Sequence, residues 1–180
     1  MYINQFDTDA QCAKTGKSAE DLFELFLKKA KKKYRPANLA EQYRHIDFVV
    51  YGKKEIKIDV KGPKKVNRSH SNTNDDFIWV EFKNVRGDAG WLYGENDLIA
   101  FYREIDTSFY VVKTSELAEL CEQLCDNKVV YYSSDALYHR YTRAGRKDVL
   151  SLIKFEDLFK MKYNRIKIRI KKKEVKGEEN

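Results

Sequence analysis

Apolar residues recur at helical spacing in the first part of the chain. Within residues 18–34 they fall three and four positions apart, and Ser18 is a favourable N-cap at the start of this stretch. The stretch ends in the basic run KKAKKKY, where cations suit the C-terminal end of a helix dipole. The pattern therefore predicts an amphipathic helix that begins at Ser18 and ends in a basic turn. Its apolar stripe consists of Ala19, Leu22, Phe23, Phe26, Leu27 and Ala30.

Alternation of apolar and polar residues follows this helix. Residues 45–51 and 55–61 have the pattern of strands, and the turn signal Gly-Lys-Lys separates them. This order predicts a β-hairpin. In the second strand one side is apolar, whereas Asp59 and Lys61 point together to the other side.

The remaining chain mixes strand-like and helical patterns without an internal repeat or a convincing linker. Residues 62–76 are polar and rich in turn residues, which indicates a loop. Further strands are expected at 77–85, 97–104, 108–114, 128–133 and 149–153, a second helix at 115–125, and a helical turn at 155–159. The order of helix, three strands with extras, helix and strand is typical of an α/β or α+β fold with helices packed on a central mixed sheet.

Composition limits the class of protein. The chain has 180 residues, of which 42% are hydrophobic, so we expect a single folded domain at 1–165, followed by a charged tail at 166–180. No run approaches 18 apolar residues, which excludes a membrane span, and the first residues do not resemble a secretion signal. Three cysteines without CxxC spacing favour a reducing compartment over a disulfide framework or a zinc site. The net charge of +7 favours a polyanionic partner such as nucleic acid.

The hairpin carries the candidate chemistry. Asp47 lies in its first strand, and Asp59 and Lys61 lie in its second. Paired strands are about 4.8 Å apart, so a tight turn brings Asp47 close to Asp59. Two carboxylates at that distance repel each other unless a positive charge lies between them, and Mg²⁺ with oxygen ligands is the usual solution. Lys61 would then orient or deprotonate a water, or stabilise charge on a phosphoryl transition state. Taken alone, an Asp-x-Lys strand is more often a solvated sheet face.

The run from Asp47 through Asp59-Val60-Lys61 resembles the signature of the PD-(D/E)XK nucleases. In that signature a lone acid is followed by an acid-x-lysine triplet at the end of the next strand. Ile46 stands where the proline that gives the family its name would be.

The resemblance extends beyond this motif, over about residues 14 to 160. Segments 79–102 and 143–158 are similar to blocks of a phage and bacterial branch that resembles Holliday-junction resolvases. Glu20, in the first helix, lies where many members of the family carry an acid.

The family resemblance implies a restriction-endonuclease-like core with the order αβββαβ and extra strands. It implies a nuclease that hydrolyses phosphodiester bonds with Mg²⁺, or with Mn²⁺ as a substitute. Asp47, Asp59 and the carbonyl of Val60 would hold the metal, Lys61 would be the catalytic lysine, and Glu20 a further catalytic acid. DNA is the expected substrate, a homodimer would suit cleavage of both strands, and the cytoplasm of a bacterial or phage-infected cell is the expected location.

For other polar residues, both a role in the site and a structural role are considered. Glu20 is equally well explained as an exposed acid in the first turn of a helix. Glu81 alternates with apolar residues on the third strand and either joins the metal site or lies on a solvated face. For Asp97, a role in positioning the strand that follows is favoured. His45 and His139 are assigned no special role.

Basic and aromatic residues outside the motif are candidates for contacts with DNA. The basic ones are Lys64, Lys65, Arg68, Arg143, Arg146, Lys147, Lys167, Arg169 and Lys171. The last three alternate with isoleucines, which predicts an edge strand whose basic side tracks phosphates or only protects the sheet edge. Tyr138 and Tyr141 would stack on bases if they are exposed, although packing in the core is the favoured interpretation.

Two functions of different classes follow. The first is a metal-dependent endonuclease in DNA processing, recombination or repair. The second is a non-catalytic nucleic-acid-binding module with a nuclease-like fold. The enzyme is favoured because Asp47, Asp59 and Lys61 are all present.

Overall fold

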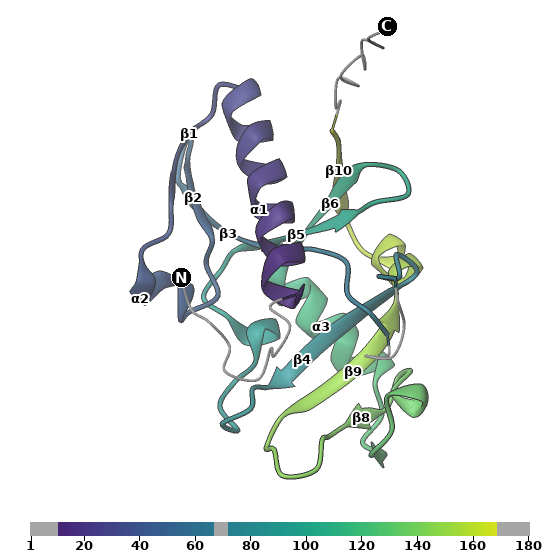
Figure 1. Ribbon diagram of the computed structural model, residues 1–180. Helices are drawn as coiled ribbons and strands as arrows, with labels where there is room; N and C mark the ends of the chain where they lie inside the picture. Colours follow the sequence, from purple (N-terminus) through teal and green to yellow (C-terminus); the bar gives the residue numbers. More distant parts are fainter. Residues whose placement is uncertain (1–10, 67–71, 169–180) are drawn as a thin grey trace, which may run out of the picture.

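The protein folds as two β-sheets with helices packed against them (Figure 1). The structure is a computed structural model and describes residues 11–66 and 72–168. The helices are α1 (Gln11–Lys29), α2 (Leu39–Gln42) and α3 (Thr114–Leu124), with the 3₁₀ helices η1 (Trp91–Tyr93), η2 (Ser133–Asp135) and η3 (Phe155–Lys160). The strands are β1 (Lys33–Pro36), β2 (Phe48–Tyr51), β3 (Glu55–Lys61), β4 (Phe77–Lys83), β5 (Leu98–Arg103), β6 (Ser108–Lys113), β7 (Val129–Val130), β8 (Arg140–Tyr141), β9 (Val149–Lys154) and β10 (Tyr163–Lys167).

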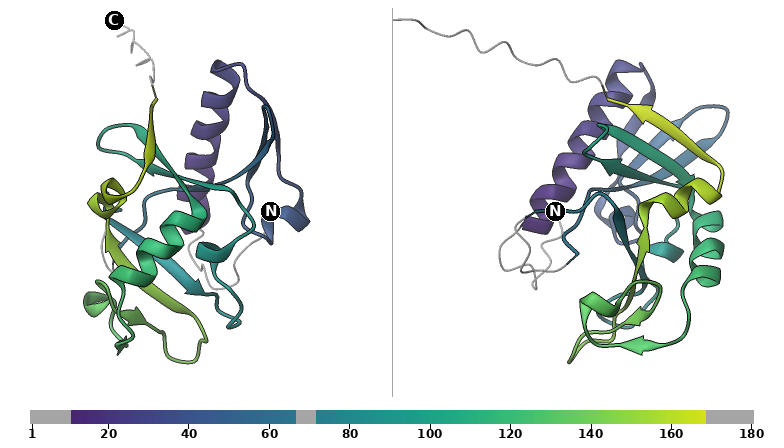
Figure 2. Two further views of the ribbon diagram at one scale, coloured as in Figure 1. Left: turned by 180° about the vertical axis from the view of Figure 1, so that it is seen from behind. Right: turned by 90° about the vertical axis from the view of Figure 1, so that its right-hand side faces the viewer.

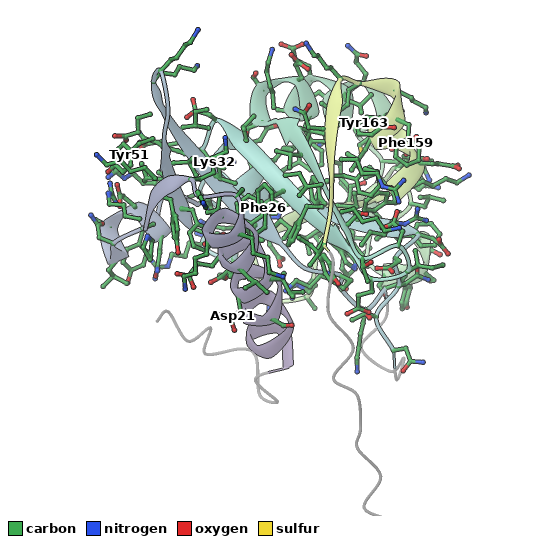
Figure 3. All side chains as sticks on the ribbon, turned by 90° about the horizontal axis from the view of Figure 1, so that it is seen from above. Asp21, Phe26, Lys32, Tyr51, Phe159 and Tyr163 are labelled. Carbon is green, nitrogen blue, oxygen red and sulfur yellow. The ribbon has the colours of Figure 1, made fainter. Side chains whose placement is uncertain are left out.

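The main sheet has the strand order β1-β2-β3-β5-β6-β10. Only β3 and β5 pair in parallel, and the other neighbours are antiparallel, so the sheet is mixed. Seen from above, Tyr51 on β2 and Tyr163 on β10 lie on opposite sides of the molecule, as this order requires (Figure 3). The predicted fold class, helices on a central mixed sheet, is confirmed, and so is the β2–β3 hairpin.

A second sheet, with the order β4-β9-β8-β7, was not foreseen. The strand expected at 77–85 is found as β4, but it lies in this second sheet, because the edge of β3 pairs with β5. Residues 62–76 carry the chain away, and β4 pairs with β9 far along the sequence. The predicted strand at 128–133 shortens to Val129–Val130 at the edge of this sheet.

The two faces of the main sheet are covered by different elements. On one face α1 packs against β3 and β5 through an apolar cluster that includes Phe23, Ile58 and Val60. On the other face α3, η1 and the smaller sheet enclose a second cluster. Figure 2 (right) accordingly shows α1 and α3 on opposite sides of the main sheet. The candidate catalytic residues point toward this second cluster.

The predicted start of the first helix is wrong, whereas its basic C-terminal turn is confirmed by Lys28 and Lys29 in the last turn. The helix begins at Gln11, so that Ser18 is an exposed residue within it and not its N-cap. An exposed serine inside a helix costs only about 0.5 kcal/mol relative to alanine, so Ser18 does not prevent the helix from including residues 11–17. The helix ends at Lys29, and part of the expected basic turn forms β1, which pairs with β2.

The end of the described chain forms β10 at the edge of the main sheet, where it pairs with β6. The predicted edge strand is therefore found, although it begins at Tyr163. Ile166 and Ile168 pack toward the α1 cluster, while Lys167 is exposed. Arg169 and Lys171 lie outside the described residues.

Two further expectations concern the helices. Cys121 on α3 and Cys125 at its C-cap are buried free thiols. No helix within 11–66 or 72–168 has both the length and the apolar composition needed to cross a bilayer.

Candidate active site

The alternation along β3 places Asp59 and Lys61 together on the face opposite α1. Ile58 and Val60 point to the α1 cluster, so the residues between and after them point the other way. Asp59 is only 2% exposed. The motif is therefore not a solvated sheet face, and a carboxylate in this position needs partners.

Lys61 is the first of these partners. Its Nζ lies 2.8 Å from Oδ1 and 2.7 Å from Oδ2 of Asp59, so the ammonium spans both oxygens of the carboxylate. The ring of Trp91 lies against the same ammonium, with 5.3 Å between Nζ and the ring centroid. The lysine head is thus held between a carboxylate and an aromatic face.

Asp47 is the second partner of Asp59. It precedes β2, and its amide donates to the carbonyl of Ile58 at 2.9 Å. Its carboxylate accepts a hydrogen bond of 2.7 Å from the amide of Val60 and lies within hydrogen-bonding reach of the Asp59 carboxylate. The hairpin therefore brings together the three residues that the sequence singled out.

The electrostatics of this group are unusual. Burial raises the pKa of Asp59 well above its ordinary range; Lys61 opposes this shift and Asp47 adds to it. Burial also acts to lower the pKa of Lys61, but the carboxylates of Asp59 and Asp47 outweigh it, so the net shift is upward. One site thus combines a carboxyl group whose pKa is raised with a lysine that retains its charge.

Glu81 on β4 faces the same site from the smaller sheet. Burial raises its pKa, and Lys61 interacts with its carboxylate electrostatically. Its Oε2 accepts a hydrogen bond of 3.4 Å from the amide of Trp91. An added Cβ on Gly90 would lie 2.2 Å from the carbonyl oxygen of Glu81, so only glycine lets η1 lie this close to β4. Gly90 thereby positions Trp91 over Lys61.

His45 is a neighbour that the sequence did not reveal. Burial and the charge of Lys61 lower its pKa to about 4, against the opposing effect of Asp47. It adopts a positive φ of 61° and packs against Gly94. Its position two residues before Asp47 was the available signal, because the hairpin register that pairs Phe48 with Ile58, when extended, places His45 opposite Lys61.

The donor set at Asp47 and Asp59 suits a hard cation. Successive residues of a strand direct their carbonyl groups to alternate edges, so the Val60 carbonyl lies on the edge where the Val60 amide meets Asp47. Within the described part of the chain, no group of three or more Asp, Glu, His or Cys side chains is arranged to hold a metal ion. Mg²⁺ needs only one or two carboxylates, with water and phosphate completing its shell, and the residues fit this requirement.

Other acids are placed elsewhere. Glu20 is half-buried on α1, the helix on the opposite face of β3 from Asp59. The carboxylate of Asp97 accepts a hydrogen bond of 2.8 Å from the amide of Lys57, and its own amide donates to the Lys57 carbonyl. Asp97 therefore positions β3 next to β5, as the favoured interpretation held.

The predicted DNA-binding residues form two separate groups. Lys64 and Lys65 follow β3, and Lys65 lies close to β4 because its carbonyl accepts a hydrogen bond from the indole of Trp79. The segment 143–147, with Arg143, Arg146 and Lys147, joins β8 to β9 in the same sheet as β4. Lys167 lies on β10, at the far edge of the main sheet from β2. Arg68 lies outside the described residues.

Arg143 and Tyr138 each contact a buried aspartate of the fold. The guanidinium of Arg143 donates from Nε to Asp148 at 2.6 Å, and Asp148 is fully buried. The hydroxyl of Tyr138 donates to buried Asp157 at 2.7 Å, in agreement with its expected packing role. Tyr141 instead lies partly exposed against Trp79.

Comparisons with known proteins identify no family for this chain. No family model matches the sequence, and no curated protein matches it. Among solved structures, the chain is similar to a bacterial homing endonuclease, I-Ssp6803I, with 17% sequence identity and a TM-score of 0.42. The similarity covers 61% of this chain and 73% of the other. The function is therefore argued from the residues of the site.

Proposed function

We propose that the protein is a metal-dependent nuclease that hydrolyses phosphodiester bonds of DNA, with Mg²⁺ as its cofactor and Mn²⁺ as a substitute. The observation that supports this most is the buried carboxylate of Asp59, which lies between the ammonium of Lys61 and the carboxylate of Asp47. Two adjoining carboxylates, one of them buried, are expensive unless a proton or a cation is shared between them.

Each residue has a defined part in this reaction. The carboxylates of Asp47 and Asp59 and the carbonyl of Val60 would hold Mg²⁺. The metal, when bound, would polarise the scissile phosphate and a water. Lys61 would orient the attacking water, or stabilise the charge that develops on the phosphate. The ring of Trp91 lies against the lysine head, and the carboxylate of Glu81 interacts with it electrostatically.

The resemblance of the Asp47 and Asp59-Val60-Lys61 run to the PD-(D/E)XK signature points to the same chemistry. The net charge of +7 favours the polyanionic substrate. The proposal includes three more specific expectations. The protein would act in DNA processing, recombination or repair, it would cut within a strand as an endonuclease, and it would assemble as a homodimer.

A cleavage panel tests the proposal. The purified chain is incubated with Mg²⁺ or Mn²⁺ and with linear, circular, flapped and four-way DNA, with single-stranded RNA as a further substrate. We expect cleavage that requires the metal and stops with EDTA. Nicking of the circular DNA distinguishes an endonuclease from an exonuclease.

Asp59→Ala is the matched control, because it removes the central carboxylate and adds no bulk. Cleavage that persists in this variant would come from another site or a contaminant and would overturn the proposal. Binding of DNA by the native chain, without cleavage under any metal, would instead favour a non-catalytic nucleic-acid-binding module.

A further inference from the structure

The smaller sheet has one face in the core and one face turned away from it. Ile78, Val80 and Phe82 of β4 point into the cluster that also contains residues of α3. Trp79 and Glu81 alternate with them and therefore point to the opposite face. In Figure 1 the strands β4, β9 and β8 of this sheet lie below the main sheet.

This outer face carries a pair of aromatic rings. The centroids of Trp79 and Tyr141 are 5.6 Å apart, with the ring planes at 42°, and both residues are partly exposed. Glu81 and Tyr141 are each paired with Leu150, so these three side chains share one face. The Trp79 indole also donates a hydrogen bond of 3.0 Å to the carbonyl of Lys65, which fixes the orientation of the ring.

The aromatic pair is close to the candidate active site. Glu81 shares its face and interacts electrostatically with Lys61. Tyr141 is two strands away from Glu81 in the sheet, which corresponds to about 10 Å. A nucleic-acid strand that contacts both the metal ligands and this face would have to span only a short distance.

The surroundings of the pair are basic. Lys65 lies beside Trp79, and Arg143 follows Tyr141 by two residues. Lys147 is exposed, and its stem packs next to Gly87 in the turn after β4. Partly exposed rings among cations are the usual composition of surfaces that bind single-stranded nucleic acid by base stacking.

We infer that Trp79 and Tyr141 form a stacking site for an unpaired nucleotide of the nucleic acid that the protein binds. The inference rests on the proposed function for its polyanionic ligand, and it narrows the substrate class to nucleic acid with a single-stranded segment next to the cleaved bond. A base within a duplex keeps both its faces stacked on its neighbours, so it cannot stack on this pair without leaving the helix.

Tryptophan fluorescence reports on this site directly. The full chain is titrated in EDTA with oligothymidylate of about 16 nucleotides, near the upper end of typical single-strand site sizes. The same oligomer, annealed to its complement, is the duplex control. We expect saturable quenching by the single strand and little by the duplex. Trp79→Phe should lose this quenching and still bind labelled oligomer in an anisotropy titration, because phenylalanine retains a ring for stacking.

Tyr141→Ala and Tyr132→Ala form a matched pair of variants. Tyr132 is 74% exposed, so its truncation controls for the loss of a surface tyrosine. Loss of one stacked base predicts about tenfold weaker binding for Tyr141→Ala, and native affinity for Tyr132→Ala. Thermal melts establish that each variant is folded.

The outcomes separate this inference from the proposed function. Equal quenching by single strand and duplex, unchanged affinity of a folded Tyr141→Ala, or no quenching at all would each overturn the stacking site. Cleavage that depends on Asp59 would leave the nuclease proposal standing in all three cases. Quenching by single strands, without cleavage under any metal, would reject the nuclease proposal and retain the stacking site.

Discussion

Two buried aspartates of this protein, Asp59 and Asp157, are equally inaccessible but differ in their partners. Each is 2% exposed, and each is paired with a lysine. Asp157 also accepts hydrogen bonds from the Tyr138 hydroxyl at 2.7 Å and from the Lys154 amide at 3.0 Å. Asp59 has the carboxylate of Asp47 as its other close neighbour.

The consequence appears in the pKa values. Burial acts to raise the pKa of Asp157, but the hydrogen bonds from Lys160 and Tyr138 outweigh it, and the pKa is lowered. Burial raises the pKa of Asp59, and its lysine does not compensate. A carboxylate with enough donors stabilises a fold, whereas one that shares its site with a second carboxylate is suited to bind a cation.

The largest expected effect is on catalysis. Asp59→Ala should abolish metal-dependent cleavage, and Lys61→Ala should reduce the rate by a factor of about 100 or more. Asp59→Ala should also weaken metal binding, whereas Lys61→Ala should largely preserve it, because an ammonium is not a metal ligand. Single-turnover cleavage and a metal titration of each folded variant measure the two effects.

Asp47→Asn tests the second carboxylate. We expect activity to be lost at low Mg²⁺, with partial recovery at high Mn²⁺, since one charged ligand is removed. The concentration of Mg²⁺ at half-maximal rate should rise by at least about tenfold, the lower limit of losses found for residues that only support metal ligands. A variant that unfolds, with normal metal dependence in its folded fraction, would show that Asp47 is a structural partner.

Asp157→Asn should have the opposite profile. The Tyr138 hydroxyl and the Lys154 amide would lose their charged acceptor, with an expected cost of about 2 kcal/mol in the free energy of unfolding. Cleavage per folded molecule should stay at the native rate. Urea unfolding and cleavage, measured on the same preparation, check both statements, and a loss of metal-dependent cleavage in the folded protein would remove the contrast with Asp59.

The smallest expected effect concerns pH. The pKa of Asp59 is raised in the folded state. The contribution of protonated Asp59 to the stability of the fold is therefore fully present below the pKa of Asp59 in the unfolded chain, and it is lost as pH rises through the pKa of Asp59 in the folded protein. Asp59→Asn mimics the protonated form, so in EDTA the melting temperature of this variant should exceed that of the native chain by a margin that grows as pH rises above the ordinary pKa of an aspartate, about 4. A margin that shrinks over this range would mean that the pKa of Asp59 is lowered instead.

The sequence contained enough to find the centre of the candidate site but not its surroundings. Asp47, Asp59 and Lys61 belong to one hairpin, so pairing of adjacent strands brings them together without knowledge of the fold. The hairpin register that pairs Phe48 with Ile58, when extended, also places His45 opposite Lys61, whereas Trp91 meets Lys61 only because η1 packs on β4. Contacts between residues so far apart leave no local pattern.

The same reason explains the errors in the fold. Alternation predicted the strand at 77–85, but it cannot specify that β4 pairs with β9 in a separate sheet. The apolar pattern of the first helix starts at Ala19, so it gave no reason to extend the helix to Gln11. The difference between Asp59 and Asp157 was also invisible, because the Tyr138 hydroxyl reaches Asp157 through tertiary packing, although the Lys154 amide is a local contact at the start of η3.

The most direct test of the central claim is a count of bound Mn²⁺ by electron paramagnetic resonance, with the native chain, Asp59→Asn and Asp157→Asn compared at equal folded concentration. Asparagine preserves the shape of each side chain and removes only its charge. We expect the native chain and Asp157→Asn to bind Mn²⁺ alike, and Asp59→Asn to leave it free in solution. Undiminished binding in Asp59→Asn, or no binding by the native chain, would contradict the assignment of Asp59 as a metal ligand.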